Sequence, residues 1–173
     1  MDPGFLNHQT RKPRAVVLTI SDSASRGERQ DLSGPTAQRE LLQLGCVVLE
    51  TRVVPDELNQ IKEQLIRWSD QDDVDLIVTS GGTGLSPRDV TPEATAAVVE
   101  REVPGLAELM RLEGMKTSPR AVLSRAKVGI RTKTLILNLP GSVRGVSESL
   151  RALAPVLFHA LEVISGFSSH CGD

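Results

Sequence analysis

A glycine-rich segment in the middle of the chain combines residue types that bind phosphate. Gly81, Gly82 and Gly84 lack side chains, so backbone N–H groups at these positions can close around phosphate oxygens. Thr83 adds a hydroxyl donor to the same loop. The branched apolar residues that precede the loop predict a buried parallel strand over residues 74–79. A strand that ends in such a loop is typical of an anion site.

Two charged residues follow the glycines and extend the predicted chemistry. Arg88 can pair with phosphate, and Asp89 can bind the metal ion that phosphates usually bring. Thr91 and Pro92 then predict the start of a helix, with Thr91 as its N-cap. The glycine spacing fits neither GxGxxG nor GxxxxGKS/T, which argues against Rossmann-type dinucleotide binding and P-loop hydrolysis. A flexible turn is the alternative interpretation of the glycines alone.

Polar residues also follow the other predicted strands. Ser21 and Asp22 come after the first strand, and Asp56 comes after the second. Because the carboxyl ends of parallel strands share one edge of an open sheet, these residues are expected near the glycine-rich loop. We therefore expect Asp56 and Asp89 to hold one Mg²⁺ ion against a nucleotide phosphate. Helix capping is the alternative function of Asp56. The last strand ends in a further loop, which contains Asn138, Pro140, Gly141 and Ser142.

The elements that position these residues alternate between strand and helix along the chain. This order predicts an α/β fold with three α-β-α layers, a mostly parallel sheet and a small β-hairpin. Pro155 is expected to break or restart the last helix. The predicted strands cover residues 15–20, 47–54, 74–79, 128–130 and 134–139, of which the last two form the hairpin. The predicted helices cover residues 36–44, the region after Asp56, residues 91–102, a stretch from Pro104, and residues 119–124 and 143–165.

Length and composition limit the class of protein. The 173 residues suit a single domain, which we expect over residues 15–167. Residues 1–14 show no periodicity and are interpreted as a disordered extension or an expression remnant, and residues 168–173 as a tail. The formal net charge of -2 and the scattered basic residues argue against a nucleic-acid-binding protein.

Cysteine usage and hydropathy indicate the compartment. Cys46 and Cys171 provide neither a disulfide framework nor metal-ligand spacing, which indicates a reducing environment. No apolar run approaches the length of about 20 residues that crosses a bilayer, and no signal-peptide core is present at the N-terminus. We therefore expect a cytoplasmic protein without a membrane partner.

Six segments, in this order along the chain, carry a likeness to a known family. They are Thr19-Ile-Ser-Asp22, Asp31-Leu-Ser-Gly-Pro35, Val54-Pro-Asp-Glu57, residues 80–94, Leu123-Ser-Arg125 and Asn138-Leu-Pro-Gly141. With these motifs the chain resembles the molybdopterin adenylyltransferase family, the MogA type that includes the gephyrin G domain and its plant counterpart. The resemblance covers nearly all of residues 15–166.

The resemblance implies an enzyme of molybdenum cofactor biosynthesis that assembles as a homotrimer. In the implied reaction the terminal phosphate of molybdopterin attacks the α-phosphate of ATP, which gives adenylylated molybdopterin and pyrophosphate. ATP and molybdopterin would be the substrates, Mg²⁺ the cofactor, and other molybdenum cofactor enzymes possible partners. Two phosphates repel each other, so such a site needs a metal ion, backbone N–H groups and cations rather than a strong base. Arg88 can stabilise the transferring group, and an ordinary surface arginine is the alternative.

The resemblance also assigns functions to individual positions. Asp56 and Asp89 look like the acidic pair of the family, which serves Mg²⁺-ATP and adenylyl transfer. Ser124 and Asn138 match polar positions of its pterin and phosphate pocket. The residues that look like part of the ligand cradle are Gly81, Gly82, Thr83 and Gly84, while Ser21 and Asp22 would line the nucleotide side.

Three alternatives stay open at the level of sequence. The related MoaB type shares the fold and the glycine-rich loop, and would bind molybdopterin or a nucleotide without transferring anything. A trimeric scaffold, as in gephyrin, is a second alternative, although no long linker or second domain accompanies the unit here. A domain of the competence-damage-protein type shares part of the glycine-rich region but normally belongs to a longer chain.

Overall fold

A six-stranded, mostly parallel sheet forms the centre of the molecule. The computed structural model describes residues 11–166, and its strands lie in the order β2-β1-β3-β6-β5-β4. The four strands β2, β1, β3 and β6 run parallel, whereas β5 and β4 pair antiparallel at the far side. The strands are β1 (Arg14–Ile20), β2 (Val47–Val54), β3 (Leu76–Ser80), β4 (Arg101–Glu102), β5 (Val128–Arg131) and β6 (Thr134–Leu139).

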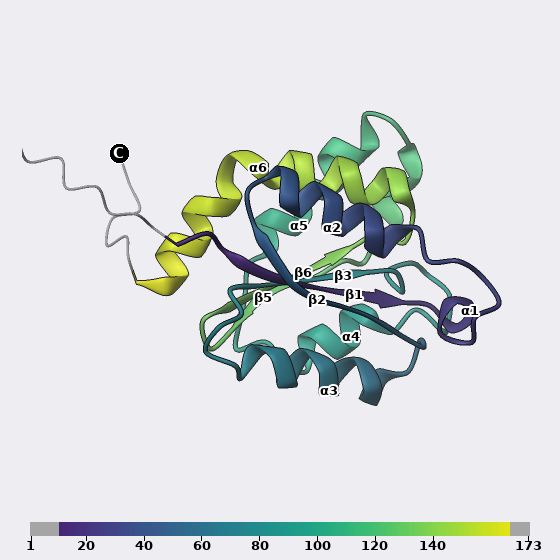
Figure 1. Cartoon of the computed structure of the whole chain (residues 1–173). Helices are drawn as coiled ribbons and strands as arrows, with labels where there is room; N and C mark the ends of the chain where they lie inside the picture. The colour runs from purple at the N-terminus through teal and green to yellow at the C-terminus, as the bar shows by residue number, and fades with distance from the viewer. Residues whose placement is uncertain (1–10, 167–173) are drawn as a thin grey trace, which may run out of the picture.

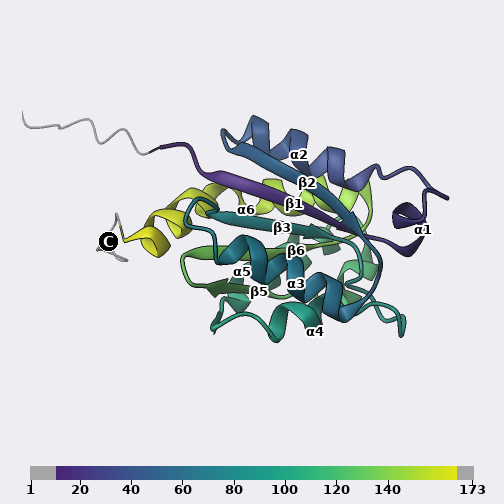
Figure 2. The ribbon, with the colours of Figure 1, turned by 60° about the horizontal axis from the view of Figure 1, so that its bottom comes forward.

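Helices cover both faces of this sheet, as Figures 1 and 2 show. One face carries α2, α5 and α6, and the other carries α3 and α4. This arrangement confirms the predicted three-layer α/β fold, and β5 and β6 confirm the predicted hairpin. The helices are α1 (Asp22–Ser25), α2 (Ser33–Gln43), α3 (Leu58–Ser69), α4 (Thr91–Ala96), α5 (Pro104–Met115), the 3₁₀ helix η1 (Pro119–Leu123) and α6 (Val143–Ser165).

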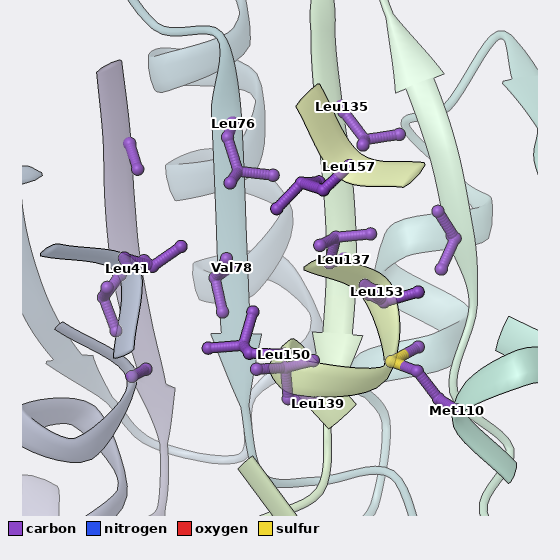
Figure 3. Packing of buried hydrophobic residues seen from close by; sticks show 14 of the residues in the cluster. Leu41, Leu76, Val78, Met110, Leu135, Leu137, Leu139, Leu150, Leu153 and Leu157 are labelled. Carbon is purple, nitrogen blue, oxygen red and sulfur yellow. The ribbon is translucent and has the colours of Figure 1, made fainter. Parts of the chain in front are cut away.

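The apolar runs of the sequence become strands that are buried on both faces. Every residue of β3 and of β6 is buried, because helices lie above and below both strands. On the α6 face, leucines of β3 and β6 pack against leucines of that helix (Figure 3). Each fully buried leucine contributes about 1.5–3 kcal/mol relative to an exposed one. The central strands are therefore a rigid base for the loops that follow them.

One predicted helix is much shorter than expected. The prediction of residues 91–102 is wrong, since α4 ends at Ala96. Beyond it the chain pairs with β5 instead: Glu100 N donates to Ile130 O at 2.9 Å, and Val103 N donates to Val128 O at 2.8 Å. The sheet partner satisfies these N–H groups, so residues 101 and 102 become strand β4.

Three other features of the helices also differ from the sequence prediction: the continuity of one helix and the starts of two others. The last helix is continuous over residues 143–165, so the expected break at Pro155 is wrong. Pro155 is exposed, and the buried leucines at 153 and 157 hold the helix against the core on both sides of it. The helix predicted at 36–44 begins earlier, at Ser33, because the carboxylate of Asp31 accepts the N–H of Gly34 at 3.0 Å. Val90, not Thr91, is the N-cap of α4.

The structure describes only part of the two terminal segments predicted from the sequence. The predicted tail at 168–173 lies outside them, as do residues 1–10 of the predicted extension and Cys171. Residues 11–14 contact the sheet: Arg14 begins β1, and Arg11 forms an ion pair with Asp75 at 2.8 Å. In residues 11–166 there is no helix whose length and hydropathy would let it span a bilayer.

Candidate functional site

The carboxyl ends of the parallel strands meet at one edge of the sheet. In the strand register, Ile20 lies beside Val54, and Ser80 lies beside Leu139. The loops that follow these strands therefore start side by side. This places the polar loops predicted from the sequence at residues 21–22, 56, 81–89 and 140–142 along a single edge.

The glycine-rich loop is held tightly at this edge. Gly81 has φ of +103°, and a Cβ at this position would lie 2.2 Å from the carbonyl oxygen of Ile20. Gly82 has φ of +63°, and its Cβ would lie 2.3 Å from Thr91 Oγ1. That hydroxyl donates to the Gly81 carbonyl at 2.9 Å, so Thr91 closes the loop rather than capping a helix. Neither glycine can be replaced without moving neighbouring atoms.

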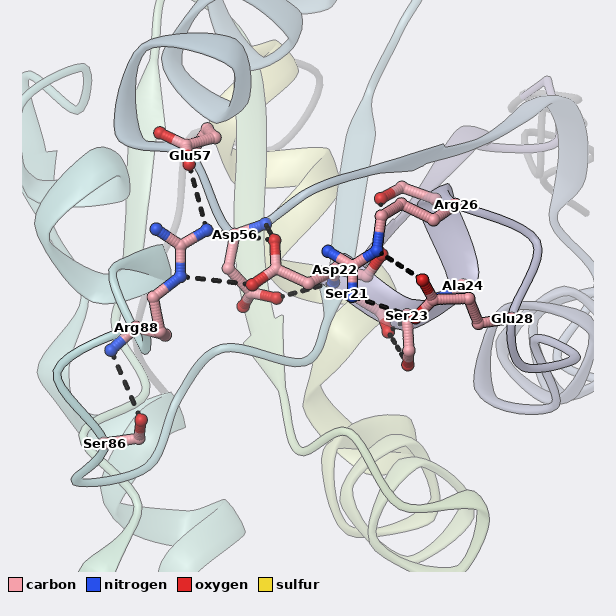
Figure 4. Close-up of polar contacts among 11 residues, drawn as sticks. Ser21, Asp22, Ser23, Ala24, Arg26, Glu28, Asp56, Glu57, Ser86 and Arg88 are labelled. Carbon is pink, nitrogen blue, oxygen red and sulfur yellow. Dashed lines mark hydrogen bonds and ion pairs between the residues drawn. The ribbon is translucent and has the colours of Figure 1, made fainter.

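Asp56 and Asp22 bind each other through a reciprocal pair of hydrogen bonds (Figure 4). The backbone N–H of Asp22 donates to Asp56 Oδ2 at 2.8 Å, and that of Asp56 donates to Asp22 Oδ1 at 3.1 Å. Residue Glu57, not Asp56, is the N-cap of α3. The capping alternative for Asp56 is therefore wrong, and its carboxylate instead ties the ends of β1 and β2 together.

Asp56 and Asp89 both lie against the glycine-rich loop. A Cβ on Gly82 would come within 3.1 Å of Asp56 Oδ1, and a Cβ on Gly84 would come within 2.9 Å of Asp89 Oδ2. Burial raises the pKa of Asp56 above its ordinary value, and the negative charges of Asp22 and Asp89 raise it further. The structure thus brings the two predicted acidic residues close enough to interact.

Arg88 is the cation of this acidic region. Its guanidinium donates to both carboxylate oxygens of Asp22, at 3.0 and 3.1 Å, and to Glu57 at 2.9 Å (Figure 4). Its hydrogen bond is the main reason why the pKa of Asp22 lies below the ordinary value. Arg88 therefore joins the glycine-rich loop to the ends of β1 and β2. Its guanidinium is already hydrogen-bonded to two carboxylates, those of Asp22 and Glu57.

A cavity of about 480 Å³ lies beside the same loop, between α5, η1 and α6. Six of the predicted binding residues line it, namely Thr83, Gly84, Ser124, Asn138, Pro140 and Ser142. The other predicted residues, Ser21, Asp22, Gly81, Gly82 and Gly141, do not line it. Gly141 packs against the glycine-rich loop, since its Cβ would lie 3.2 Å from Gly81 Cα. Thr83 and Gly84 thus connect the cavity with the acidic region.

Asn138 forms part of the cavity wall but its amide is already bonded. The side chain is fully buried, and its Nδ2 donates to Thr79 Oγ1 at 3.0 Å and to Thr95 Oγ1 at 2.8 Å. Its Oδ1 accepts the N–H of Lys127 at 3.2 Å. These bonds join β6 to β3, α4 and the residues before β5. The geometry therefore gives Asn138 a supporting function and leaves little of its amide for a ligand.

The cavity also contains cationic residues that the sequence did not single out. Arg111, Arg120 and Arg144 line it, from α5, η1 and α6. Arg111 donates to the backbone carbonyls of Ser124 and Ala126, at 3.4 and 3.2 Å. Isolated arginines on three separate helices give no local motif, so only their convergence in space reveals them.

The donor set at the acidic region fits a magnesium ion. Asp56 Oδ2 accepts a backbone N–H, whereas no hydrogen bond to its Oδ1 is found within residues 11–166. In the same residues no three His, Cys, Asp or Glu side chains gather as a complete metal cage. Mg²⁺ typically takes one or two carboxylates and completes its shell with water and substrate phosphates. Two aspartates that both lie against the glycine-rich loop meet that requirement.

Comparisons with known proteins agree in pointing to one family. Residues 16–159 match the family model described as a probable molybdopterin binding domain. The chain is 43% identical over 152 residues to the molybdopterin adenylyltransferase of Helicobacter pylori strain J99, a match that covers 87% of this chain and 86% of that protein.

Solved structures give the same result. The molybdopterin biosynthesis enzyme MoaB from Thermus thermophilus is 52% identical with a TM-score of 0.84, over 88% of this chain and 96% of that one. The molybdopterin biosynthesis Mog protein from Mycobacterium ulcerans is 43% identical with a TM-score of 0.84, over 91% and 99%.

Proposed function

Because this chain belongs to the family of probable molybdopterin binding domains, we propose that it is a molybdopterin adenylyltransferase of molybdenum cofactor biosynthesis. In the reaction an oxygen of the terminal phosphate of molybdopterin attacks the α-phosphorus of ATP. A new phosphoanhydride bond forms, the bond between the α- and β-phosphates breaks, and pyrophosphate leaves. The observation that carries the proposal is the shared loop, since Thr83 and Gly84 line the large cavity while Gly82 and Gly84 contact the two aspartates.

In this proposal the two substrates approach the loop from its two neighbouring sites. The cavity of about 480 Å³ has the size of a small-molecule pocket and takes molybdopterin, with Arg111 and Arg120 to offset its phosphate charge. Arg144 is ion-paired at 2.7 Å with Glu148, which also lines the cavity. ATP lies along Ser21, Asp22 and the acidic pair. The N–H groups of Gly82, Thr83 and Gly84 then face the phosphates of both substrates, which is where negative charge accumulates in the transition state, while that of Gly81 is bonded to the Leu139 carbonyl.

Asp56 and Asp89 would hold Mg²⁺. When bound, the ion supplies positive charge that neutralises the phosphates of ATP and assists the departure of pyrophosphate. The attacking phosphate is already ionised at neutral pH, so no side chain has to remove a proton from it. The work of this chain is to orient two anions and to place the two aspartates beside them.

The direct test is to supply purified protein with molybdopterin, ATP and Mg²⁺ and to measure adenylylated molybdopterin and pyrophosphate. The wild-type protein should form both products. Asp89→Asn removes one negative charge with little change of shape and should lower turnover by about 100-fold or more, the order found when one transition-state contact is lost. Asp72→Asn is the matched control, because Asp72 is an exposed carboxylate before the start of β3, whereas the glycine-rich loop follows the end of that strand. Equal turnover in Asp89→Asn and wild type would remove Asp89 from the mechanism.

Binding of molybdopterin without transfer is a second candidate function. The chain is 52% identical to a structure named as the molybdopterin biosynthesis enzyme MoaB, and the MoaB type is the alternative that the sequence left open. The same assay separates the two functions. Wild-type protein that binds molybdopterin but yields no pyrophosphate would support the binding function.

A further inference from the structure

Arg125 is a partly exposed arginine that contacts the glycine-rich loop along much of its length. Its Nε donates to the carbonyl of Gly84 at 2.7 Å, and one of its terminal nitrogens donates to the carbonyl of Asp89 at 2.6 Å. The other terminal nitrogen forms an ion pair with Glu93 on α4. The backbone N–H of Arg125 also donates to the Thr83 carbonyl at 2.9 Å. One residue thus binds the loop before, within and after the segment 84–89.

This segment has few other attachments to the body of the protein. Residues 85–88 are all exposed, and Leu85 is 64% exposed. Inside the segment, Asp89 N donates to Ser86 O at 2.9 Å, and Ser86 N donates to Asp89 Oδ2 at 2.8 Å. These internal bonds shape the turn but do not fix its position. The position comes from Arg125 on one side and from the ion pairs of Arg88 on the other.

We propose that Arg125 is a positioning residue, which holds the segment 84–89 so that the Asp89 carboxylate stays beside Asp56 and ready for Mg²⁺-ATP. The inference rests on the proposed function, since it concerns the same metal and nucleotide. A planar guanidinium is suited to this function because it can bridge two carbonyl oxygens and a carboxylate at fixed angles. Groups that orient a metal-binding carboxylate typically contribute about 10- to 100-fold to metal affinity.

The two arginines of the site have different functions in this proposal. Arg88 belongs to the segment itself and pairs only with carboxylates, of which that of Glu57 is exposed, so salt and water weaken this ion pair. Arg125 lies outside the segment, between η1 and β5. It binds two backbone carbonyls of the segment, those of Gly84 and Asp89. Arg125 therefore sets where Asp89 lies, whereas Arg88 links the loop to Asp22.

The test measures binding of Mg²⁺ with the non-transferable analogue α,β-methylene-ATP by calorimetry, together with amide hydrogen exchange of residues 84–89. In Arg125→Ala we expect the dissociation constant to rise about 10- to 100-fold. Exchange in the segment should become faster in the same variant. The KM for molybdopterin should change less than twofold, since Arg125 is not among the residues that line the cavity. Arg125→Lys should lie between wild type and Arg125→Ala, because a single ammonium cannot bridge both carbonyls.

Arg131→Ala is the matched control. Arg131 also binds a backbone carbonyl, that of Val98, and a carboxylate, that of Asp70, but at the opposite end of the sheet. A purely structural effect would lower the melting temperature in both variants and leave both dissociation constants unchanged. That result would overturn the proposal, as would weaker binding without faster exchange in the segment. If Arg125→Ala fails to fold, the same measurements on Arg125→Lys test the proposal. A dissociation constant equal to that of wild type in Arg125→Lys would overturn it.

The transfer assay on wild-type protein keeps the two hypotheses apart. Wild type that binds the analogue but makes no adenylylated molybdopterin contradicts the proposed function, while Arg125 is still judged by the calorimetry. Wild type that is active, with Arg125→Ala equal to it in binding, contradicts only the inference about Arg125. Wild type that binds no Mg²⁺ and analogue would contradict both.

Discussion

Asp56 is the residue in which stability and the proposed chemistry conflict most. Its carboxylate is half-buried and close to the carboxylates of Asp22 and Asp89. Burial and these charges raise its pKa, and the hydrogen bond from the backbone of Asp22 offsets them only in part. Ionised Asp56 therefore destabilises the folded protein, although the positive charge of Arg88 offsets part of the repulsion. The same cluster of carboxylates is what a Mg²⁺ ion requires.

We expect Asp56→Asn to raise the melting temperature near neutral pH while it abolishes transfer. The folded pKa of Asp56 lies above the ordinary value of 3.8. Below that ordinary value both the folded and the unfolded state hold the proton, so the charge penalty is absent. The penalty develops as pH rises through the folded pKa, and it stays at neutral pH. An asparagine oxygen can still accept the Asp22 N–H. Thermal melts of both proteins, from acid to neutral pH and without divalent metal, measure the difference.

The higher melting temperature of Asp56→Asn relative to wild type should therefore disappear as the pH falls. Asp72→Asn, an exposed charge outside the cluster, controls for the general effect of removing an aspartate. A lower melting temperature for Asp56→Asn at neutral pH would mean that its hydrogen bonding outweighs the charge repulsion.

At the scale of elements, the loop after β3 depends on strand ends that are distant in sequence. Gly81 N donates to the carbonyl of Leu139 at 3.2 Å, and Thr91 N donates to that of Gly82 at 3.1 Å. The loop therefore fits between β1 and β6 with no room for a side chain at Gly81. This fixed geometry supports the interpretation of the glycines as a binding loop and argues against a flexible turn.

Gly81→Ala should lower the free energy of unfolding by about 2 kcal/mol or more. A residue forced into an unfavourable backbone conformation costs about 1–3 kcal/mol, and the new methyl group would also collide with the Ile20 carbonyl, 2.2 Å away. Urea unfolding followed by circular dichroism measures the change. Gly105→Ala is the control, because nothing lies within 4 Å of a Cβ at the start of α5. If both variants unfold at the same urea concentration, the loop is more adaptable than its contacts indicate.

At the scale of the whole molecule, one edge of the sheet is unusual. Strand β2 has eight residues and no neighbour on its outer side within residues 11–166. It carries Val47, Leu49 and Val53, which are 41%, 38% and 38% exposed. Natural proteins usually protect long edge strands with charge or cover. Contact between copies of the chain would cover these apolar side chains.

The resemblance to the adenylyltransferase family led us to expect a homotrimer, and this edge is consistent with association. Light scattering after size exclusion should give a mass three times the chain mass of 18.7 kDa. The measurement should be repeated over about a hundredfold range of concentration, since a stable trimer keeps its mass on dilution. A mass of one chain throughout would contradict the prediction.

Patterns between near neighbours in the sequence were sufficient for much of the architecture. Runs of branched apolar residues predicted five of the strands, and the glycines marked a loop that needs positive φ. The alternation of elements also predicted that polar strand ends gather at one edge, where Asp56 and Asp89 both lie against the glycine-rich loop. These features follow from local sterics and periodicity, which each short segment carries within itself.

Partners distant in sequence decided the rest. Residues 101 and 102 form a strand instead of the predicted helix because they pair with β5. The side chain of Asn138 is bonded to Thr79 and Thr95, which are 59 and 43 positions away. Arg125 binds carbonyls 41 and 36 positions earlier in the chain, and its own motif, Leu123-Ser-Arg125, does not reveal these partners. A polar group bonds to whichever partner folding brings within about 3 Å. That choice depends on packing of the complete chain, so only the tertiary structure could show it.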